Sequence, residues 1–181
     1  MIRPVGQDAK SRLGPITRLV QASGKGGGRD GVSVEAPTMV ARNRRYFLFY
    51  SIANYANDSY AVSVAASRRK ANTPTGGNFT KFAGNPIYSG KTNKLNKPDA
   101  AFCGVGHQDI MPLPNDRWVI FAHAYLRETP PAQPGGNARC KGKRQLVADE
   151  LRWTGRRNRP LLRTIATTTD PEIGTPQTVG R

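Results

Sequence analysis

The sequence predicts an all-β fold built from repeated hairpins, most simply the blades of a β-propeller. The first observation is a repeat: residues 35–51 align without a gap over residues 107–123, at an offset of 72 (107 − 35). The second is the form of each copy, in which an apolar run reaches a polar turn at Asn43 or Asn115 and an aromatic and β-branched run returns. That form is typical of a β-hairpin, and hairpins repeated at a period of tens of residues predict a radial array.

The two copies begin with chemically distinctive residues, Glu35 and His107. A gapless offset of 72 keeps the strand phase, because side-chain direction alternates with a period of two. Equivalent blades place these residues at equivalent positions near the central axis. We therefore expect both side chains to point into one axial cavity, with Arg144 entering from the next blade.

The other elements are read from alternation and from turn residues. Over residues 60–66, Tyr60, Val62 and Val64 alternate with smaller side chains, which predicts a strand with two distinct faces. The glycine-rich stretch 23–31 is followed by a strand-like sequence rather than by the helix of a phosphate-binding loop, so it is predicted to be a connection. In chain order the expected strands are 14–20, 38–41, 46–51, 60–66, 79–82, 108–113, 117–124 and 144–153, with a loop linker at 83–104.

Length and composition fit one globular β domain. The chain has 181 residues, of which 37% are hydrophobic, and it contains no run of about 18 apolar residues, so no membrane partner is expected. The first eight residues lack the apolar segment of a secretion signal. The sequence assigns no compartment, and an extracellular location stays open for a longer parent protein.

The charge is strongly positive, at +16 from 28 Lys and Arg against 12 Asp and Glu. The cations gather mostly at predicted turns and are not interleaved with aromatic residues that could stack on bases. We expect no specific nucleic-acid partner and only weak, salt-sensitive binding to polyanions. The basic clusters are residues 42–45, 68–70, 139–144 and 152–159.

The two cysteines, Cys103 and Cys140, each precede a predicted strand element. Both could lie on one rim of the fold, so a disulfide and two free thiols are both open. No CxxC pair and no Cys/His zinc spacing is present.

The chain resembles glycoside hydrolase family 43 in six motifs that follow one another in the family's order. The resemblance covers about residues 12 to 163 and implies the family's fold, a five-bladed propeller. It implies that residues 1–163 form the C-terminal part of such a propeller, about three blades, and that 164–181 form a loose tail. The motifs are Val34-Glu35-Ala36-Pro37, residues 46–51, Tyr60-Ala61-Val62, residues 104–108, residues 118–125 and residues 144–153.

The resemblance also implies roles for three residues. Glu35, in its Glu-Ala-Pro context, matches the general acid that protonates the leaving glycosidic oxygen. His107 matches a central histidine that binds a calcium ion or an ordered water beneath the sugar, and Arg144 matches the arginine that contacts the sugar. The implied partner is an arabinose- or xylose-containing oligosaccharide or polysaccharide of plant cell walls. His123 is expected to be a rim residue without a ligand.

One departure from the family concerns the other two carboxylates. Inverting enzymes of this family use an aspartate base and a second aspartate that tunes the acid, both upstream of the acid. Asp8 and Asp30 match neither motif, and Asp58 and Asp109 do not occupy the base position. Inverting hydrolysis needs two carboxyl groups about 6.5–9.5 Å apart, so Glu35 supplies only one of the two that the reaction requires.

The expected function is therefore a glycosidase-like domain whose base-bearing blades are missing from this sequence. A catalytically inactive carbohydrate-binding remnant is the alternative, and a basic polyanion-binding module is the third hypothesis. An open arc of blades is also expected to leave strand edges and one face of its core exposed.

Overall fold

The computed structural model describes residues 1–24, 30–67, 74, 78–89, 102–126, 140, 142–154, 161–164 and 177–178. Strands dominate these residues, and no helix among them is long and apolar enough to cross a membrane. The first five strands are β1 (Val34–Arg42), β2 (Arg45–Ile52), β3 (Ala61–Ala66), β4 (Thr80–Lys81) and β5 (Tyr88–Ser89). They are followed by β6 (Phe102–Pro112), the 3-10 turn η2 (Pro114–Asp116), β7 (Trp118–Leu126), β8 (Arg144–Thr154), β9 (Leu161–Thr164) and β10 (Gln177–Thr178).

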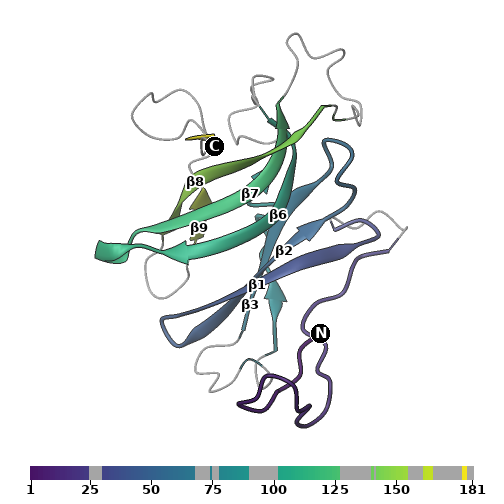
Figure 1. The fold of residues 1–181 in the computed structure, drawn as a ribbon, viewed down its shortest axis with the longest axis vertical. Coiled ribbons are helices and arrows are strands. Elements are labelled where there is room, and N and C mark those ends of the chain that lie inside the picture. The colour runs from purple at the N-terminus through teal and green to yellow at the C-terminus, as the bar shows by residue number, and fades with distance from the viewer. Residues whose placement is uncertain are drawn as a thin grey trace.

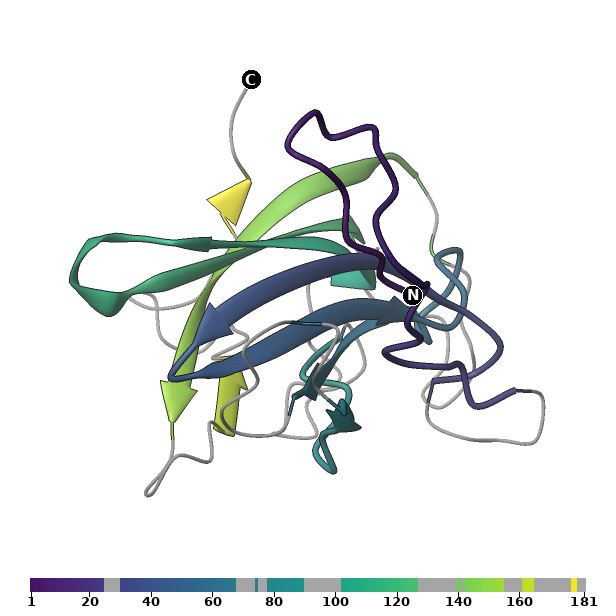
Figure 2. The same cartoon turned by 90° about the horizontal axis from the view of Figure 1, so that it is seen from below.

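The strands form two antiparallel sheets, which confirms the all-β prediction. The first sheet has the order β1-β2-β3-β4, with β5 paired to β3, and the second has the order β10-β8-β7-β6, with β9 paired to β8. The β1–β2 and β6–β7 hairpins lie beside each other with their turns pointing the same way (Figure 1). Seen from below, one sheet lies over the other (Figure 2).

The main hydrophobic core lies between the two sheets. Phe47 and Phe49 of β2 face the second sheet, as do Val62 and Val64 of β3. The predicted alternation over residues 60–66 is therefore confirmed, although β3 is buried on both faces. The second sheet contributes Phe102, Val105, Ile110, Ile120, Ala122, Ala124, Val147 and Leu151 to this core.

The N-terminal segment covers the opposite face of the first sheet. Leu19 is buried there and Ile2 packs beside it, against side chains of β2 and β3. Buried Asp30 forms an ion pair with Lys81, whose Nζ also donates to the Gln21 carbonyl at 2.5 Å. The chain therefore covers this face of the first sheet with its own residues (Figure 1), whereas Met111 and Leu146 of the second sheet are 45% and 42% exposed.

The prediction of a strand at 14–20 is wrong. Residues 1–24 make only isolated bridges, between Ile2 and Thr17 and between Val5 and Arg12. Other expected strands appear at or near the expected positions. The linker 83–104 contains β5 and the beginning of β6, while its residues 90–101 lie outside the described part of the chain.

The region expected to be a loose tail, 164–181, lies mostly outside the described residues. Within it, Gln177 and Thr178 form β10, which pairs with Ala148 and Val147 of β8. The basic cluster 68–70 lies outside the described residues.

Each long hairpin contains a β-bulge, and the bulges correct the repeat alignment. In the first hairpin the register shifts between Glu35 and Thr38. In the second it shifts twice, between Cys103 and Gly106 and between Gly106 and Asp109. The bulge of the first hairpin and the later bulge of the second, which is closer to the turn, each have a residue with positive φ, Ala36 (50°) and His107 (55°).

Superposing these two bulges pairs Ala36 with His107, so the first strands of the two hairpins are offset by 71 residues (107 − 36). The second strands keep the offset of 72 (122 − 50), because Tyr50 faces the first bulge and Ala122 faces the other. The counterpart of Glu35 is therefore Gly106, so the proposed equivalence of Glu35 and His107 is wrong by one residue.

The two hairpin turns are tied together at one end of the molecule, which we call the turn end. Asn43 and Arg44 both have positive φ, as a type I′ hairpin turn requires. Arg42 forms an ion pair with Asp116, which holds the pKa of that carboxyl at about 2. The Arg42 guanidinium also lies 5.7 Å from the Trp118 ring centre and 5.2 Å from that of Trp153.

Candidate functional site

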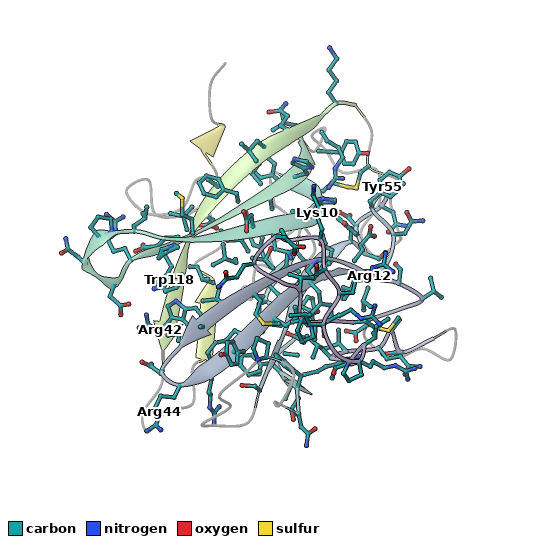
Figure 3. The ribbon with its side chains drawn as sticks, turned by 60° about the horizontal axis from the view of Figure 1, so that its bottom comes forward. Lys10, Arg12, Arg42, Arg44, Tyr55 and Trp118 are labelled. Atoms are coloured by element: carbon teal, nitrogen blue, oxygen red, sulfur yellow. A yellow bond between two sulfur atoms is a disulfide. The ribbon has the colours of Figure 1, made fainter. Side chains whose placement is uncertain are left out.

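The bulges lie at the opposite end of the hairpins, which we call the site end. Figure 3 shows Tyr55, in the loop after β2, far from the turn-end residues Arg42, Arg44 and Trp118. Glu35 lies at the start of β1 directly across the ladder from Ser51 near the end of β2. Antiparallel pairing of β1 with β2 thus brings an exposed carboxylate next to a fully buried hydroxyl.

Tyr60 connects Glu35 with Arg144. Its side chain is 1% exposed, and burial raises the pKa of its hydroxyl. The negative charge of Glu35 raises that pKa further, while a hydrogen bond with Ser51 and the positive charge of Arg144 lower it. Glu35 and Arg144 therefore both act on one buried hydroxyl, although they come from different sheets.

Arg144 is the first residue of β8 and is held between two tyrosines. Its guanidinium carbon lies 5.5 Å from the ring centre of Tyr60 and 5.6 Å from that of Tyr125. Its Nη2 donates to the His123 carbonyl at 3.3 Å. The expectation that Arg144 enters from another blade than His107 is wrong, because β8 and β6 belong to one sheet.

The two histidines of the chain stack at this end. The rings of His107 and His123 are 5.7 Å apart at an angle of 18°. His107 is joined to the first sheet because its backbone N–H donates to Ser51 Oγ at 2.7 Å. The expected rim histidine, His123, is therefore a direct neighbour of the expected site residues His107 and Arg144.

The structure thus brings the three sequence-predicted residues, Glu35, His107 and Arg144, to one end of the fold. It adds residues that the sequence did not single out. Ser51, Tyr60 and Gln108 stood within the motifs, but a hydroxyl or amide at a strand end gives no signal of its own. Their interactions with Glu35, His107 and Arg144, or with residues next to these, depend on the packing of the two sheets.

The alternative carboxylates lie elsewhere in this arrangement. Asp109 is exposed, and its Oδ1 accepts from the backbone N–H of Ile110 at 2.8 Å. Asp58 is buried next to Cys103 and Cys140, which form a disulfide. Disulfide sulfurs are not thiolate ligands, so this group of three residues does not make a metal centre.

The described residues do not fit a calcium ion bound directly to His107. Ca²⁺ takes six to eight oxygen ligands, whereas His107 offers imidazole nitrogens. Among the described residues, a set of three side chains with metal-ligand atoms close together occurs at Asp58 with the two cysteines and not at His107. No chemical step below uses a metal.

The histidine pair gives a testable pH dependence. Burial lowers the pKa of His123, and the positive charges of Arg144 and His107 lower it further. Because the folded pKa lies below the usual 6.5, unfolded chains bind more protons in this range, and the stability from neutral His123 is lost as pH falls below about 6.5. NMR titration is expected to find His123 titrating below 6.5 and shifting upward in Arg144→Met. An unshifted His123 contradicts the geometry.

Comparisons with known proteins identify the family of the chain and the likeness of its fold. A family model described as "Glycosyl hydrolases family 43" matches residues 2–156. A comparison with curated proteins gives no match.

Three solved structures illustrate the likeness in fold. A thermostable family-43 glycoside hydrolase has a TM-score of 0.66 at 23% identity, covering 97% of this chain and 49% of that one. An endo-1,4-beta-xylanase from Bacteroides thetaiotaomicron has a TM-score of 0.61 at 20% identity, covering 91% and 49%. An exo-1,5-alpha-L-arabinanase from a bovine ruminal metagenomic library has a TM-score of 0.54 at 16% identity, covering 88% and 47%. The chain spans about half the length of these proteins.

Proposed function

The chain belongs to glycosyl hydrolases family 43, and from this premise we propose that its site end binds an arabinose or xylose unit of a plant polysaccharide. The observation that carries the proposal is the convergence of Glu35 and Arg144 on Tyr60, beside the His107–His123 pair. A carboxyl, a guanidinium and exposed imidazoles at one end of two packed sheets supply the donors and acceptors that sugar hydroxyls need. Two structural neighbours, an endo-1,4-beta-xylanase and an exo-1,5-alpha-L-arabinanase, support this sugar class.

We assign Glu35 the role of general acid, which protonates the leaving glycosidic oxygen. Its carboxyl is exposed at the start of β1, where a sugar can reach it. Arg144 contacts the sugar through its guanidinium, and His107 lies under the sugar next to His123. Inverting hydrolysis needs a second carboxylate as base, and we place it in the half of the family fold that this chain does not span.

The proposal also concerns how the two sheets are arranged in the complete family fold. We infer that the two sheets are consecutive blades of a five-bladed propeller, so the described residues form two blades and not the three or so that the resemblance implies. Their equivalent bulges support this inference, because each lies where a hairpin reaches the site end. In a complete propeller the blades surround a central channel, and we place the sugar at the site end next to that channel.

Binding is tested by titrating the chain with xylo- and arabino-oligosaccharides. We expect saturable binding that Arg144→Met weakens about tenfold or more, because hydrogen bonds to a charged group contribute about 1.5–3 kcal/mol. Arg44→Met is the matched control, since Arg44 is an exposed arginine at the turn end. Equal affinities in the two variants, or no saturable binding by the unaltered chain, would refute the proposed site.

Hydrolysis tests the assignment of the base. On aryl arabinofuranoside and aryl xyloside we expect no meaningful turnover by this chain alone. Turnover that disappears in Glu35→Gln shows that these 181 residues include a base, and it contradicts the placement of the second carboxylate elsewhere. A second assay adds a polypeptide with the half of a family-43 fold that this chain does not span. If Glu35 is the acid, turnover by the mixture depends on Glu35, whereas a purely binding role for Glu35 does not have this effect.

A further inference from the structure

The site end contains a buried polar network that the proposed chemistry does not use. Ser51 Oγ donates to Gln108 Oε1 at 2.8 Å, and Gln108 Nε2 donates to the Ala36 carbonyl at 2.6 Å. Ser51 is 0% and Gln108 4% exposed. Buried amides and hydroxyls are costly without partners, so this arrangement persists only while its hydrogen bonds are made.

Two more hydrogen bonds cross between the sheets at the same place. The backbone N–H of His107 donates to Ser51 Oγ at 2.7 Å, and Thr38 Oγ1 donates to the Gln108 carbonyl at 3.0 Å. All four bonds join the bulge of the first hairpin to that of the second. They also surround Glu35, because Ser51 lies opposite Glu35 and Ala36 follows it.

The bulges need such support from outside their own strands. Ala36 and His107 both have left-handed backbone conformations, which residues with a Cβ adopt at a cost in energy. A bulge is also the place where a strand re-aims its side chains. A bond that holds both bulges therefore fixes the directions from which Glu35 and His107 approach the ligand.

We propose that Gln108, acting with Ser51, is a positioning residue that fixes the backbone of Glu35 relative to that of His107. The proposal rests on the proposed function in taking Glu35 and His107 as site residues. The amide is suited to this role because one group accepts from Ser51 while the other donates to the Ala36 carbonyl. Rotated by 180°, the amide would place its oxygen against the Ala36 carbonyl, so the network selects one orientation.

The experiment compares two buried amides. Gln108→Met removes the inter-sheet amide with little change in shape. Asn85→Leu is the matched control: Asn85 is 7% exposed, its Oδ1 accepts from the Val64 N–H at 3.0 Å and its Nδ2 donates to the Val64 carbonyl at 2.9 Å, within the first sheet. Both variants are expected to lower the melting temperature, so stability alone does not separate them.

The two histidines of the chain provide the separating readout. In NMR spectra, with signals assigned from His123→Gln, we expect the His107 ring signal to move in Gln108→Met and to stay in place in Asn85→Leu. Affinity for a xylo- or arabino-oligosaccharide is expected to fall about tenfold in Gln108→Met relative to the control, because misplaced binding groups lose their hydrogen bonds. A His107 signal at the same position in both variants overturns the proposal.

A second variant covers the case in which Gln108→Met does not fold. Ser51→Ala is a smaller change that removes the acceptor of the His107 N–H, the donor to Gln108 and the hydrogen bond with Tyr60. It is expected to move the His107 signal in the same way, and an unmoved signal counts against the proposal. If the unaltered chain binds no oligosaccharide, the proposed function fails, whereas the histidine signal still decides the positioning role.

Discussion

Replacing Gly106 with alanine is expected to lower the free energy of unfolding by roughly 3 kcal/mol, the upper range for overpacking a core. A Cβ at this position would lie 2.2 Å from Cε1 and 2.5 Å from Cδ1 of Tyr60. The Tyr60 side chain is 1% exposed and cannot swing into solvent without opening the packing around it. Because its hydroxyl bonds to Ser51 and is close to Glu35, the displacement also disturbs the site.

The control for this variant is Gly84→Ala. Apart from its two chain neighbours, no described residue has a heavy atom within 4 Å of the Cβ that it adds, and Gly84 does not have positive φ. We expect its stability to stay within about 0.5 kcal/mol of the unaltered chain, as for most surface substitutions. Urea unfolding of both variants measures the difference. Equal midpoints would show that the Tyr60 ring moves aside without lowering the free energy of unfolding.

The hairpins could be predicted from sequence because their signals are local. Asn43 tolerates the positive φ that a two-residue hairpin turn requires, and the alternation on either side of the turn fixes the strand faces. The all-β class and the order of the long strands follow from these signals. The family also follows, since the motifs that carry the resemblance lie almost entirely within the long strands.

The repeat register could not be read from sequence, because the turn of the second hairpin is one residue longer than that of the first. With the bulge at Ala36 matched to the one at His107, Arg42 corresponds to Leu113 and Arg45 to Arg117. The two turn residues Asn43-Arg44 therefore correspond to the three residues Pro114–Asp116. A gapless alignment at an offset of 72 still scores well, because the second strands of the two hairpins, β2 and β7, do keep that offset. It therefore assigned Glu35 the wrong counterpart.

The N-terminal segment was unpredictable for a different reason. Its apolar residues, such as Ile2 and Leu19, have no strand or helix period, since they pack irregularly on the back of a sheet formed later in the chain. The short strands β5, β9 and β10 have two to four residues each, too few to show alternation. Tertiary pairing alone makes them strands.

For the candidate site, resemblance predicted three residues and geometry added others. Glu35, His107 and Arg144 stand in recognisable motifs, and all three lie at the site end. Ser51 and Gln108 carry no such mark, since a strand sequence does not show which of its polar side chains will be enclosed by a second sheet. The sequence does not predict that His123 belongs to the site, because its stacking on His107 depends on the pairing of β6 with β7.

Removing the disulfide is expected to have the largest effect on stability. Cys103 and Cys140, which the sequence left open, are bonded across a separation of 37 residues. Closing a loop of that length restricts the unfolded chain, which corresponds to about 4 kcal/mol in the chain-entropy model. That is a large part of the stability of a typical domain, about 5–15 kcal/mol, so the reduced chain is expected to unfold at a clearly lower temperature than the oxidised chain.

The loss is also expected to reach the site end. The backbone N–H of Cys140 donates to the Ala56 carbonyl at 2.9 Å, so the disulfide ties β6 to the loop between β2 and β3 that leads to Tyr60. The double variant Cys103→Ser/Cys140→Ser and the reduced unaltered chain should unfold at the same, lower urea concentration, because both lack the cross-link. The oxidised chain should also show the His107 and His123 signals of a single folded site, while the double variant loses them under milder conditions. Identical unfolding of oxidised chain and double variant would mean that this cross-link does not limit the stability of the fold.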